Sequence, residues 1–470
     1  MAKLGQQIKK VGKGVFNSPW EQAFDKVLTP FEEFIHRQTT SSMLLMGTAL
    51  VALFLANGPL SSAYAHFIHT PVSLNVGSWA IDMSLHHWIN DGLMAMFFFV
   101  VGLELKREIL VGELADLRNA ALPIGAAIGG MVVPALIYFM INPEGDAARG
   151  WGIPMATDIA FAIGALALLA SRVPKALITF LVALAIVDDL GAVVVIAVFY
   201  TETIAFTPLL IAAALFALMI ALNLVGIRKT LPYFLVSVVF WYAVLLSGVH
   251  ATLAGVLGAL CVPAMPKYQP ERFSEQVKSL MQRFDAIQLS GQGIMTNDQL
   301  RAVVRSLESG VSSVQAPLQR LEHAWHMPVA YIVIPVFALA NAGIPLELAS
   351  MSETLSHPTF IGVSLGLILG KFIGITGVSW LMLKLNIAVL PKDTRFTQIA
   401  GVSLLAGIGF TMSIFVAQLG FGEREDLLLI AKTAILLASF VSGVAGVIWL
   451  YLVSHPQDSA ATIDELPNHS

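Results

Sequence analysis

The stretch KALITFLVALAIVDDLGAVVVIAVFY, residues 175–200, decides the fold. It is long and apolar enough to cross a bilayer as a helix, because about 20 residues rising ~1.5 Å each span the hydrocarbon. Asp188 and Asp189 stand near its middle. One aspartate at the centre of a membrane helix costs roughly 2.5–3.5 kcal/mol on insertion scales. A buried carboxylate pair is therefore by default a site for an ion or a proton.

A solvated loop is the alternative interpretation of the two aspartates, but the apolar runs on both sides leave no room for one. The composition agrees with a membrane protein. Of the 470 residues, 56% are hydrophobic and only 12% are charged, with a mean hydropathy of +0.76, whereas a soluble domain carries about 25% charged residues. The single cysteine, Cys261, excludes an intramolecular disulfide. The N-terminus lacks a signal-peptide core and is typical of a basic segment on the membrane surface.

We predict an all-α polytopic membrane protein with about 12 transmembrane helices. The candidate spans are 42–57, 90–105, 120–141, 151–170, 177–200, 206–225, 232–248, 250–264, 327–345, 359–383, 397–420 and 427–453. If the N-terminus is inside and the spans alternate, the inside segments hold 23 of the 27 Lys and Arg residues. Cytoplasmic loops carry such an excess, so we expect both termini in the cytoplasm.

These spans divide the chain into five parts. They are a cytoplasmic N-terminal segment (1–40), helices 1–8 (41–264), a cytoplasmic loop (265–326), helices 9–12 (327–453) and a C-terminal tail (454–470). The loop carries apolar residues at helical spacing and a helix start at Asn297 or Asp298, so a helical hairpin is expected there. Alternating polarity around Thr70–Val76 leaves room for a small β-hairpin on the outside.

Two spans are interrupted. Span four holds Pro154 followed by Thr157 and Asp158, and span eleven holds the stretch LLAGIGFTMSIFVA with two glycines, a threonine and a serine. Proline and glycine break the helical ladder, and the freed backbone groups need partners inside the membrane. The interrupted spans are the middle members of spans 3–5 and 10–12. Such pairs are typical of inverted repeats with a transport site between two broken, crossing helices.

Lys371 lies in the otherwise apolar span ten. A buried lysine needs a carboxylate partner or loses its proton, and Asp188, Asp189 and Asp158 are the available partners. Adjacent residues on a helix point about 100° apart, so one aspartate of the pair can face the lysine while the other faces a water-filled cavity. The alternative is a lysine that extends to the membrane surface.

Charged residues and histidines also gather at the inner ends of spans two and nine. VGLELKRE carries Glu104, Arg107 and Glu108, and QRLEHAWHMP carries Glu322, His323 and His326. Such groups titrate near neutral pH when they line a cavity. From spacing alone, a solvated run of charges is the favoured interpretation.

Several of these motifs resemble the NhaA family of bacterial sodium/proton antiporters. They are WINDGLMAMFFFVVGLELKRE, ATDIAF, LAIVDDLGA, SGVHATLAG, RLEH, FALANAG, GKFIG and AGIGFTMS, in the family's order from about residue 88 to 450. The resemblance implies that Asp188 and Asp189 bind the cation, Na⁺ or Li⁺, and carry the protons. It also implies that Thr157 and Asp158, the polar residues of the broken helix, belong to the ion-binding site, and that Lys371 pairs with the first aspartate.

The resemblance further implies that Glu104, Arg107, Glu108, Glu322, His323 and His326 form a pH-sensing cluster. Exchange of Na⁺ or Li⁺ for H⁺ is then electrogenic, activated at alkaline pH, and performed by a homodimer in the bacterial inner membrane. Gln319, where a second basic residue can precede the Arg-Leu-Glu-His run, departs from the family pattern, as do the long loop at 265–326 and the extended N-terminus. These departures bear on the pH threshold.

The exchange mechanism follows from competition, because a desolvated carboxylate holds either a proton or a sodium ion. No GxxxxGK[ST] motif is present, so a gradient must drive transport. Two alternatives remain: a subunit of a proton pump or a cation channel, and an intramembrane aspartyl protease. The protease needs two aspartates that face each other from different helices, whereas Asp188 and Asp189 are neighbours on one helix. We expect no enzymatic activity, no cofactor and no nucleic-acid partner.

Overall fold

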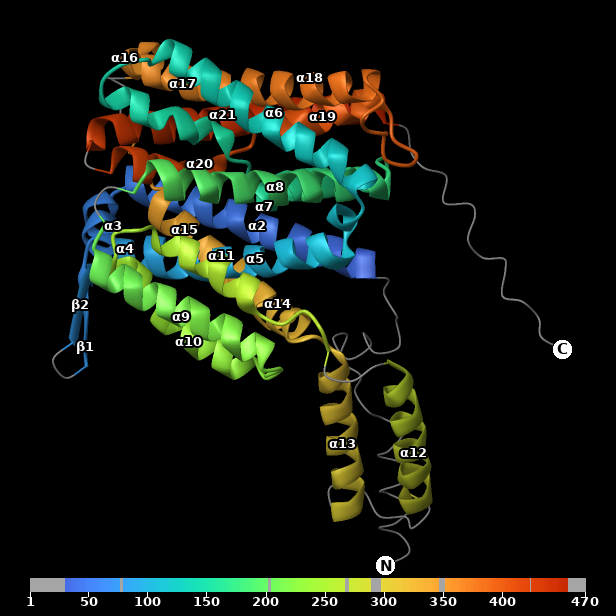
Figure 1. Cartoon of the computed structure of the whole chain (residues 1–470). Coiled ribbons are helices and arrows are strands. Elements are labelled where there is room, and N and C mark those ends of the chain that lie inside the picture. The colour runs from blue at the N-terminus through green and yellow to red at the C-terminus, as the bar shows by residue number, and fades with distance from the viewer. Residues whose placement is uncertain are drawn as a thin grey trace, which may run out of the picture.

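The computed structural model describes residues 30–454, except for 77–78, 202–203, 267–269, 289–296, 346–350 and 423. The basic segment expected at the N-terminus and nearly all of the C-terminal tail lie outside these described residues. Most of the described helices run roughly parallel to one another in a single bundle (Figure 1).

The first half of the bundle runs to residue 261. Its elements are α2 (Pro30–Asn57), α3 (Ser61–Ile68), β1 (Pro71–Val76), β2 (Trp79–Ser84), α4 (Leu85–His87), η2 (Trp88–Leu93), α5 (Met94–Val111), η3 (Glu113–Ala115), α6 (Leu117–Ile141), η4 (Asp146–Met155), α7 (Ile159–Ala167), α8 (Lys175–Phe199), α9 (Phe206–Leu224), α10 (Thr230–Leu246) and α11 (Ala251–Cys261). Local sequence sets the helix starts. Asp116, for example, accepts a hydrogen bond from the N–H of Arg118 at 3.0 Å and so caps α6.

The second half begins with two helices outside the bundle. Its elements are α12 (Pro270–Gln288), α13 (Asp298–Val314), α14 (Pro317–Pro328), η5 (Val329–Val333), α15 (Ile334–Asn341), α16 (Met351–Ser356), α17 (Pro358–Leu365), η6 (Gly366–Gly370), α18 (Lys371–Lys384), α19 (Phe396–Leu405), α20 (Phe410–Phe421) and α21 (Glu425–Val453). Asn297 accepts bonds from the N–H groups of Gln299 and Leu300 and caps α13, which confirms the predicted helix start.

Every predicted span coincides with helix, but not every helix is long and apolar enough to cross a membrane by itself. In the described residues eight helical segments meet that criterion, and the pair α19 and α20, bent by 50° at a short break, makes a ninth. Two shorter apolar helices are α10 and α11. α5 is the last of the twelve, and its apolar run ends at the charged segment that starts with Glu104. The chain is thus an all-helical polytopic membrane protein.

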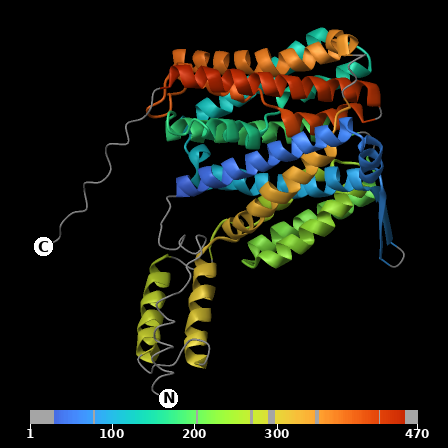
Figure 2. The ribbon, with the colours of Figure 1, turned by 180° about the vertical axis from the view of Figure 1, so that it is seen from behind.

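The bundle has two distinct ends (Figures 1 and 2). At one end, which we call the strand end, β1 and β2 form an antiparallel hairpin in which Pro71 lies opposite Ser84. At the other end, the loop end, α12 and α13 project side by side away from the bundle. The β-hairpin and the helix pair therefore lie at opposite ends of the molecule.

The helices pack in two groups. In the first group, α5 packs on α11 and α14, α10 packs on α9 and α11, and α15 lies against η2. In the second group, α6 packs on α8 and α18, and α20 and α19 pack on α21. α2 lies between the two groups, in contact with α7 and α15. This division matters below, because the polar side chains of interest join the groups.

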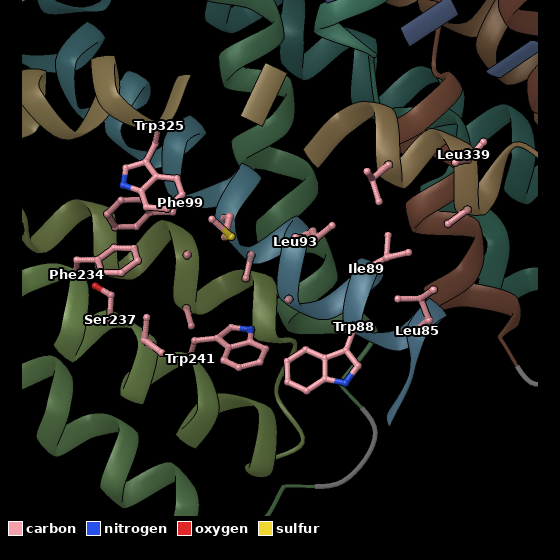
Figure 3. Close-up of a pocket in the computed structure, with 18 of the residues that line it drawn as sticks. Leu85, Trp88, Ile89, Leu93, Phe99, Phe234, Ser237, Trp241, Trp325 and Leu339 are labelled. Atoms are coloured by element: carbon pink, nitrogen blue, oxygen red, sulfur yellow. The ribbon is translucent and has the colours of Figure 1, made fainter. Parts of the chain in front are cut away.

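An apolar cavity of about 670 Å³ lies within the first group (Figure 3). Aromatic side chains dominate its wall, among them Trp88 and Trp241, which lie side by side, and Trp325, which stacks on Phe234 at 5.2 Å. Among the described residues that line it, Ser237 and the tryptophans are the only ones with a side-chain nitrogen or oxygen, and none is ionisable. A cation would find no ligand there, so this cavity is not a candidate path for ions.

Three short π-helical segments interrupt the regular helices. They are η2 before α5, η5 between α14 and α15, and η6 directly before Lys371 in α18. A π-helical turn holds one residue more than an α-helical turn needs and often marks a functional site. Each of these segments precedes or follows a polar residue discussed below.

α6 and α18 make the closest contact between two long helices in the second group. A Cβ atom on Gly374 would overlap the carbonyl oxygen of Gly129, and one on Gly129 would overlap the carbonyl oxygen of Gly374. Small residues allow such close approach of membrane helices. Gly377, one turn later on α18, has open space around it.

We therefore expect Gly374→Ala to separate α6 from α18 and to destabilise the protein by about 1–3 kcal/mol, the usual cost of overpacking. Gly377→Ala on the same helix is the matched control, and it should leave the melting temperature of the purified protein unchanged or slightly raised. Equal melting temperatures for the two variants would contradict the contact.

Candidate functional site

The two interrupted helices meet at their breaks. η4 ends at Met155 and α7 begins at Ile159, while α19 ends at Leu405 and α20 begins at Phe410. The N–H of Asp158 donates to the carbonyl of Ile408 at 2.7 Å, and the hydroxyl of Thr157 donates to the carbonyl of Ala406 at 2.9 Å. Each break thus supplies partners for backbone groups that the other break has freed.

Asp158 caps two helices at once. Its Oδ1 accepts from the N–H of Phe161 at 3.0 Å in the first turn of α7, and its Oδ2 accepts from the N–H of Thr411 at 2.9 Å in the first turn of α20. The hydroxyl of Thr411 also donates to Oδ2. A carboxylate stabilises the positive N-terminal end of a helix dipole, and this one lies at two such ends.

Carbonyl groups at the other side of each break are satisfied in the same way. The hydroxyl of Ser413, in α20, donates to the carbonyl of Ile153 at 2.8 Å, near the end of η4. Thr157, Asp158 and Ser413 are all fully or almost fully buried. The crossing is therefore held by hydrogen bonds between protein groups, as the membrane interior requires.

Lys371 forms its ion pair with Asp188. The distance from Nζ to Oδ2 is 2.7 Å, and both side chains are completely buried. Asp188 lies in α8 and Lys371 at the start of α18, directly after the π-helical segment η6. The sequence allowed three carboxylates as partners of Lys371, and in the structure the partner is Asp188. The lysine side chain does not extend to the membrane surface.

Asp189 has no such partner. Both of its carboxylate oxygens, and Oδ1 of Asp188, are buried and make no hydrogen bond within the described residues. The charged groups that act on Asp189 are Asp188, Asp158, Lys371 and Glu104. Unpartnered buried oxygens are rare because they are costly, so Asp189 is a candidate position for binding an ion or a proton.

The described residues hold no cluster of three His, Cys, Asp or Glu side chains suited to a metal ion. A cation at Asp189 would need further oxygens, from hydroxyl groups, backbone carbonyls or water, and such ligands suit small hard cations. Thr157, which lies close enough to Asp188 to interact with it, offers one hydroxyl.

A second polar group lies between α5 and α14, at the loop end. Arg107 forms ion pairs with Glu108, at 2.8 Å, and with Glu322, while Nδ1 of His326 lies 3.3 Å from Oε1 of Glu104. The structure thus brings five residues of the predicted sensor together. His323 is different, because its side chain is exposed and none of these ion pairs includes it.

A cavity of about 150 Å³ connects the two polar groups. Glu104, Arg107, Glu322 and His326 line one part of it, and Asp158 and Thr411 line another. Asp189 does not line this cavity and is completely buried. The cavity reaches the broken helices, and a water-filled cavity beside the second aspartate stays a prediction.

Three further residues of this site were not predicted from the sequence. Thr411, quoted there only as part of the interrupted span, binds Asp158, and Gln38 and Ser41 of α2 line the cavity. The break in span eleven was the signal for Thr411. Nothing in the sequence marks Gln38 or Ser41, since they stand just before an apolar run with no motif of their own.

Comparison with known proteins gives a consistent result. The family profile described as "Na+/H+ antiporter 1" matches residues 32–450. The Na⁺/H⁺ antiporter NhaA 1 of Saccharophagus degradans is 55% identical over 92% of this chain and 93% of its own. The Na⁺/H⁺ antiporters NhaA of Sulfurimonas denitrificans and Dichelobacter nodosus are 51% and 46% identical, each over 93% of this chain and over 98% and 94% of their own.

The ion pair predicts a specific pattern of stabilities. Lys371→Met leaves Asp188 buried and unpaired, which should cost about 3–5 kcal/mol. Adding Asp188→Asn removes the stranded charge, so the double variant should recover most of the loss. Thermal unfolding in detergent would measure this, with Lys384→Met, an exposed lysine of the same helix, as the control that changes little. A double variant as unstable as Lys371→Met would contradict the pairing.

Proposed function

The chain belongs to the NhaA family of sodium/proton antiporters, and on that premise we propose that Asp189, with Asp188 and Thr157 beside it, binds sodium and protons in turn. As a member of this transporter family it exchanges Na⁺ for H⁺ and is not an enzyme. The observation that carries the proposed site is the pair of buried, unpartnered oxygens of Asp189 next to the crossing of the broken helices.

The three acidic side chains take different roles in this proposal. Asp158 is committed to the two helix ends, and Asp188 is neutralised by Lys371. Asp189 is left as the group whose charge changes, because its oxygens can hold either a proton or a cation. If only the loaded forms reorient, the protein must exchange one ion for the other, and a proton gradient then expels sodium.

We further propose twelve spans with two inverted repeats, one formed by α6, η4–α7 and α8 and the other by α17–α18, α19–α20 and α21. The interruption in the middle member of each triplet supports this arrangement, and so does the contact between the two breaks. The distribution of Lys and Arg supports a cytoplasmic loop end and an outside strand end. In this proposal the protein lies in the bacterial inner membrane, and both of its termini are in the cytoplasm.

The pH sensor that we propose is the cluster of Glu104, Arg107, Glu108, Glu322 and His326. Its support is the cavity that leads from these residues to Asp158. We leave His323 out because its side chain is exposed and outside the ion pairs. A histidine that titrates beside a carboxylate is a suitable switch near neutral pH.

Other properties rest on the resemblance to the family alone. They are transport of Li⁺, electrogenic exchange, activation at alkaline pH, and a homodimer formed through the connection at 58–89. The protease alternative is weakened because both oxygens of Asp158, the second aspartate that it would need, already accept hydrogen bonds as helix caps. A pump subunit or channel remains the second candidate, which the first experiment below tests.

Asp189→Asn should abolish exchange, because an amide can neither release a proton nor neutralise a cation. The measurement is collapse of a proton gradient by Na⁺ or Li⁺ in inside-out vesicles at several pH values. Asp146→Asn removes an exposed carboxylate paired with Arg424 and should keep full exchange. Retained exchange in Asp189→Asn would refute the proposed ion site, and a wild type that answers only to K⁺ would change the substrate.

His326→Ala should shift the pH of half-activation downward by about half a unit to one unit. In the proposed resting state protonated His326 binds Glu104, so removing this contact favours the active state at lower pH. The same vesicle assay, run across a pH series, measures the shift. His323→Ala is the control, three residues away on the same helix, and should leave the profile in place. Identical profiles for wild type and His326→Ala would exclude His326 from the sensor.

A further inference from the structure

Four polar side chains meet at the strand end of the bundle. They are His86 in α4, Asn90 in η2, Asn341 at the end of α15 and Gln418 in α20. Oδ1 of Asn341 accepts a hydrogen bond from Nε2 of Gln418 and lies 3.1 Å from Nε2 of His86. The amide nitrogen of Asn341 donates to Oδ1 of Asn90 at 2.9 Å. The exchange mechanism and the predicted pH sensor do not use this cluster.

A layer of aromatic rings lies directly beneath the cluster. The ring centroid of Phe415 is 5.9 Å from that of Phe98 and 6.2 Å from that of Phe337, and all three side chains are almost completely buried. Phe337 precedes Asn341 by four residues, and Phe415 precedes Gln418 by three. Residues three or four apart share one face of a helix, so the polar layer stands one turn beyond the aromatic layer.

The same face of α20 continues to the broken helices. Thr411, which binds Asp158, precedes Phe415 by four residues. Along this helix the order is therefore the crossing of the breaks, the aromatic layer and the polar layer, with the strand end beyond. The cavity that reaches Asp158 comes from the opposite side, from Glu104 and His326. The two layers stand where an ion path from the site toward the strand end would run.

The polar layer joins the two groups of helices. His86, Asn90 and Asn341 belong to the first group, and Gln418 belongs to the second, in which α20 packs on η4 and α21. Its contacts are between neutral groups. Burial, together with the nearby Lys432, lowers the pKa of His86 to about 4, although the bond to Asn341 acts in the opposite direction and His69 and His87 also lie close. Oε1 of Gln418 is buried without a partner in the described residues.

Neutral hydrogen-bonding partners and an unpaired buried oxygen are the features expected of a contact that breaks and forms again. Hydrogen bonds between neutral amides and an imidazole can be exchanged for bonds to water at small net cost. A permanent joint between the helix groups would instead satisfy every buried polar atom.

We propose that His86, Asn90, Asn341 and Gln418 form the gate that closes the ion path at the strand end, and that Gln418 separates from Asn341 and His86 once in every exchange cycle. This inference rests on the proposed function, since it assigns positioning residues to the same exchange reaction. It identifies the moving contact as the one between α20 and the segments α4, η2 and α15.

The test is a reversible bridge across the gate. Cys261, the single cysteine, is replaced by serine, and Asn341→Cys with Gln418→Cys is added. A short bifunctional thiol reagent that can be cleaved by reduction then joins the two positions, and mass spectrometry measures the bridged fraction. We expect sodium-driven exchange to fall in proportion to that fraction and to return on reduction. His86→Cys with Gln418→Cys is a second pair that should behave in the same way.

The control bridge lies within the first group at the same end. Trp88 and Trp241 have ring centroids 6.3 Å apart on η2 and α10 (Figure 3). Bridging Trp88→Cys to Trp241→Cys should leave exchange at its rate before bridging. Exchange that continues unchanged with position 418 fully bridged to 341 or 86 would overturn the gate. A wild type that shows no response to sodium would refute the proposed function instead, because the bridging result needs an active starting protein.

Discussion

The structure depends on one constraint: backbone groups freed inside a membrane have no water to bind. Two helices are interrupted, and the freed amides and carbonyls bind across the crossing, as between Asp158 and Ile408. Neither break could exist alone, since each is the other's source of partners. The position of the carboxylates follows from this, because α7 and α19, one helix from each interrupted pair, both pack against α8. Fold and site are therefore one arrangement.

The charged groups around the crossing divide into those that have a hydrogen-bond or ion-pair partner and the one that we propose to exchange ions. Asp158 caps two helices, and Lys371 forms an ion pair with Asp188, so these three charged groups stabilise the fold. Removing any of them leaves a group buried without compensation. In the part of the chain that the structure describes, neither oxygen of the Asp189 carboxylate makes a hydrogen bond. A carrier needs one such group, because a site that is satisfied by its own protein has no affinity left for its cargo.

Much of this was predictable from the sequence, and the reasons differ from residue to residue. The tandem aspartates, the proline and the glycines are easy to recognise in the sequence, because each is energetically unfavourable within an apolar membrane helix. The same reasoning identified the two breaks and the buried lysine. The partner of Lys371 needed either the family resemblance or the structure, since three aspartates were open to it. Gln38, Ser41 and Gln418 gave no signal, because single amides and hydroxyls are tolerated in helices. Asn341 lies in the FALANAG motif, which by itself assigned it no role. His323 was predicted to belong to the charged cluster, but its side chain is exposed. Helical periodicity does not decide whether His323 or His326, three residues apart, faces solvent.

The π-helical segments carry a consequence for how this chain can vary. Each holds one residue more than an α-helix would need, and η6 ends directly before Lys371. Deleting one residue from it would let the segment relax into a regular α-helix and would remove the π-helical turn directly before Lys371. Substitutions near these segments can be absorbed locally, whereas insertions and deletions cannot. In a lineage of such proteins, length would be held more strictly than identity at 88–93, 329–333 and 366–370.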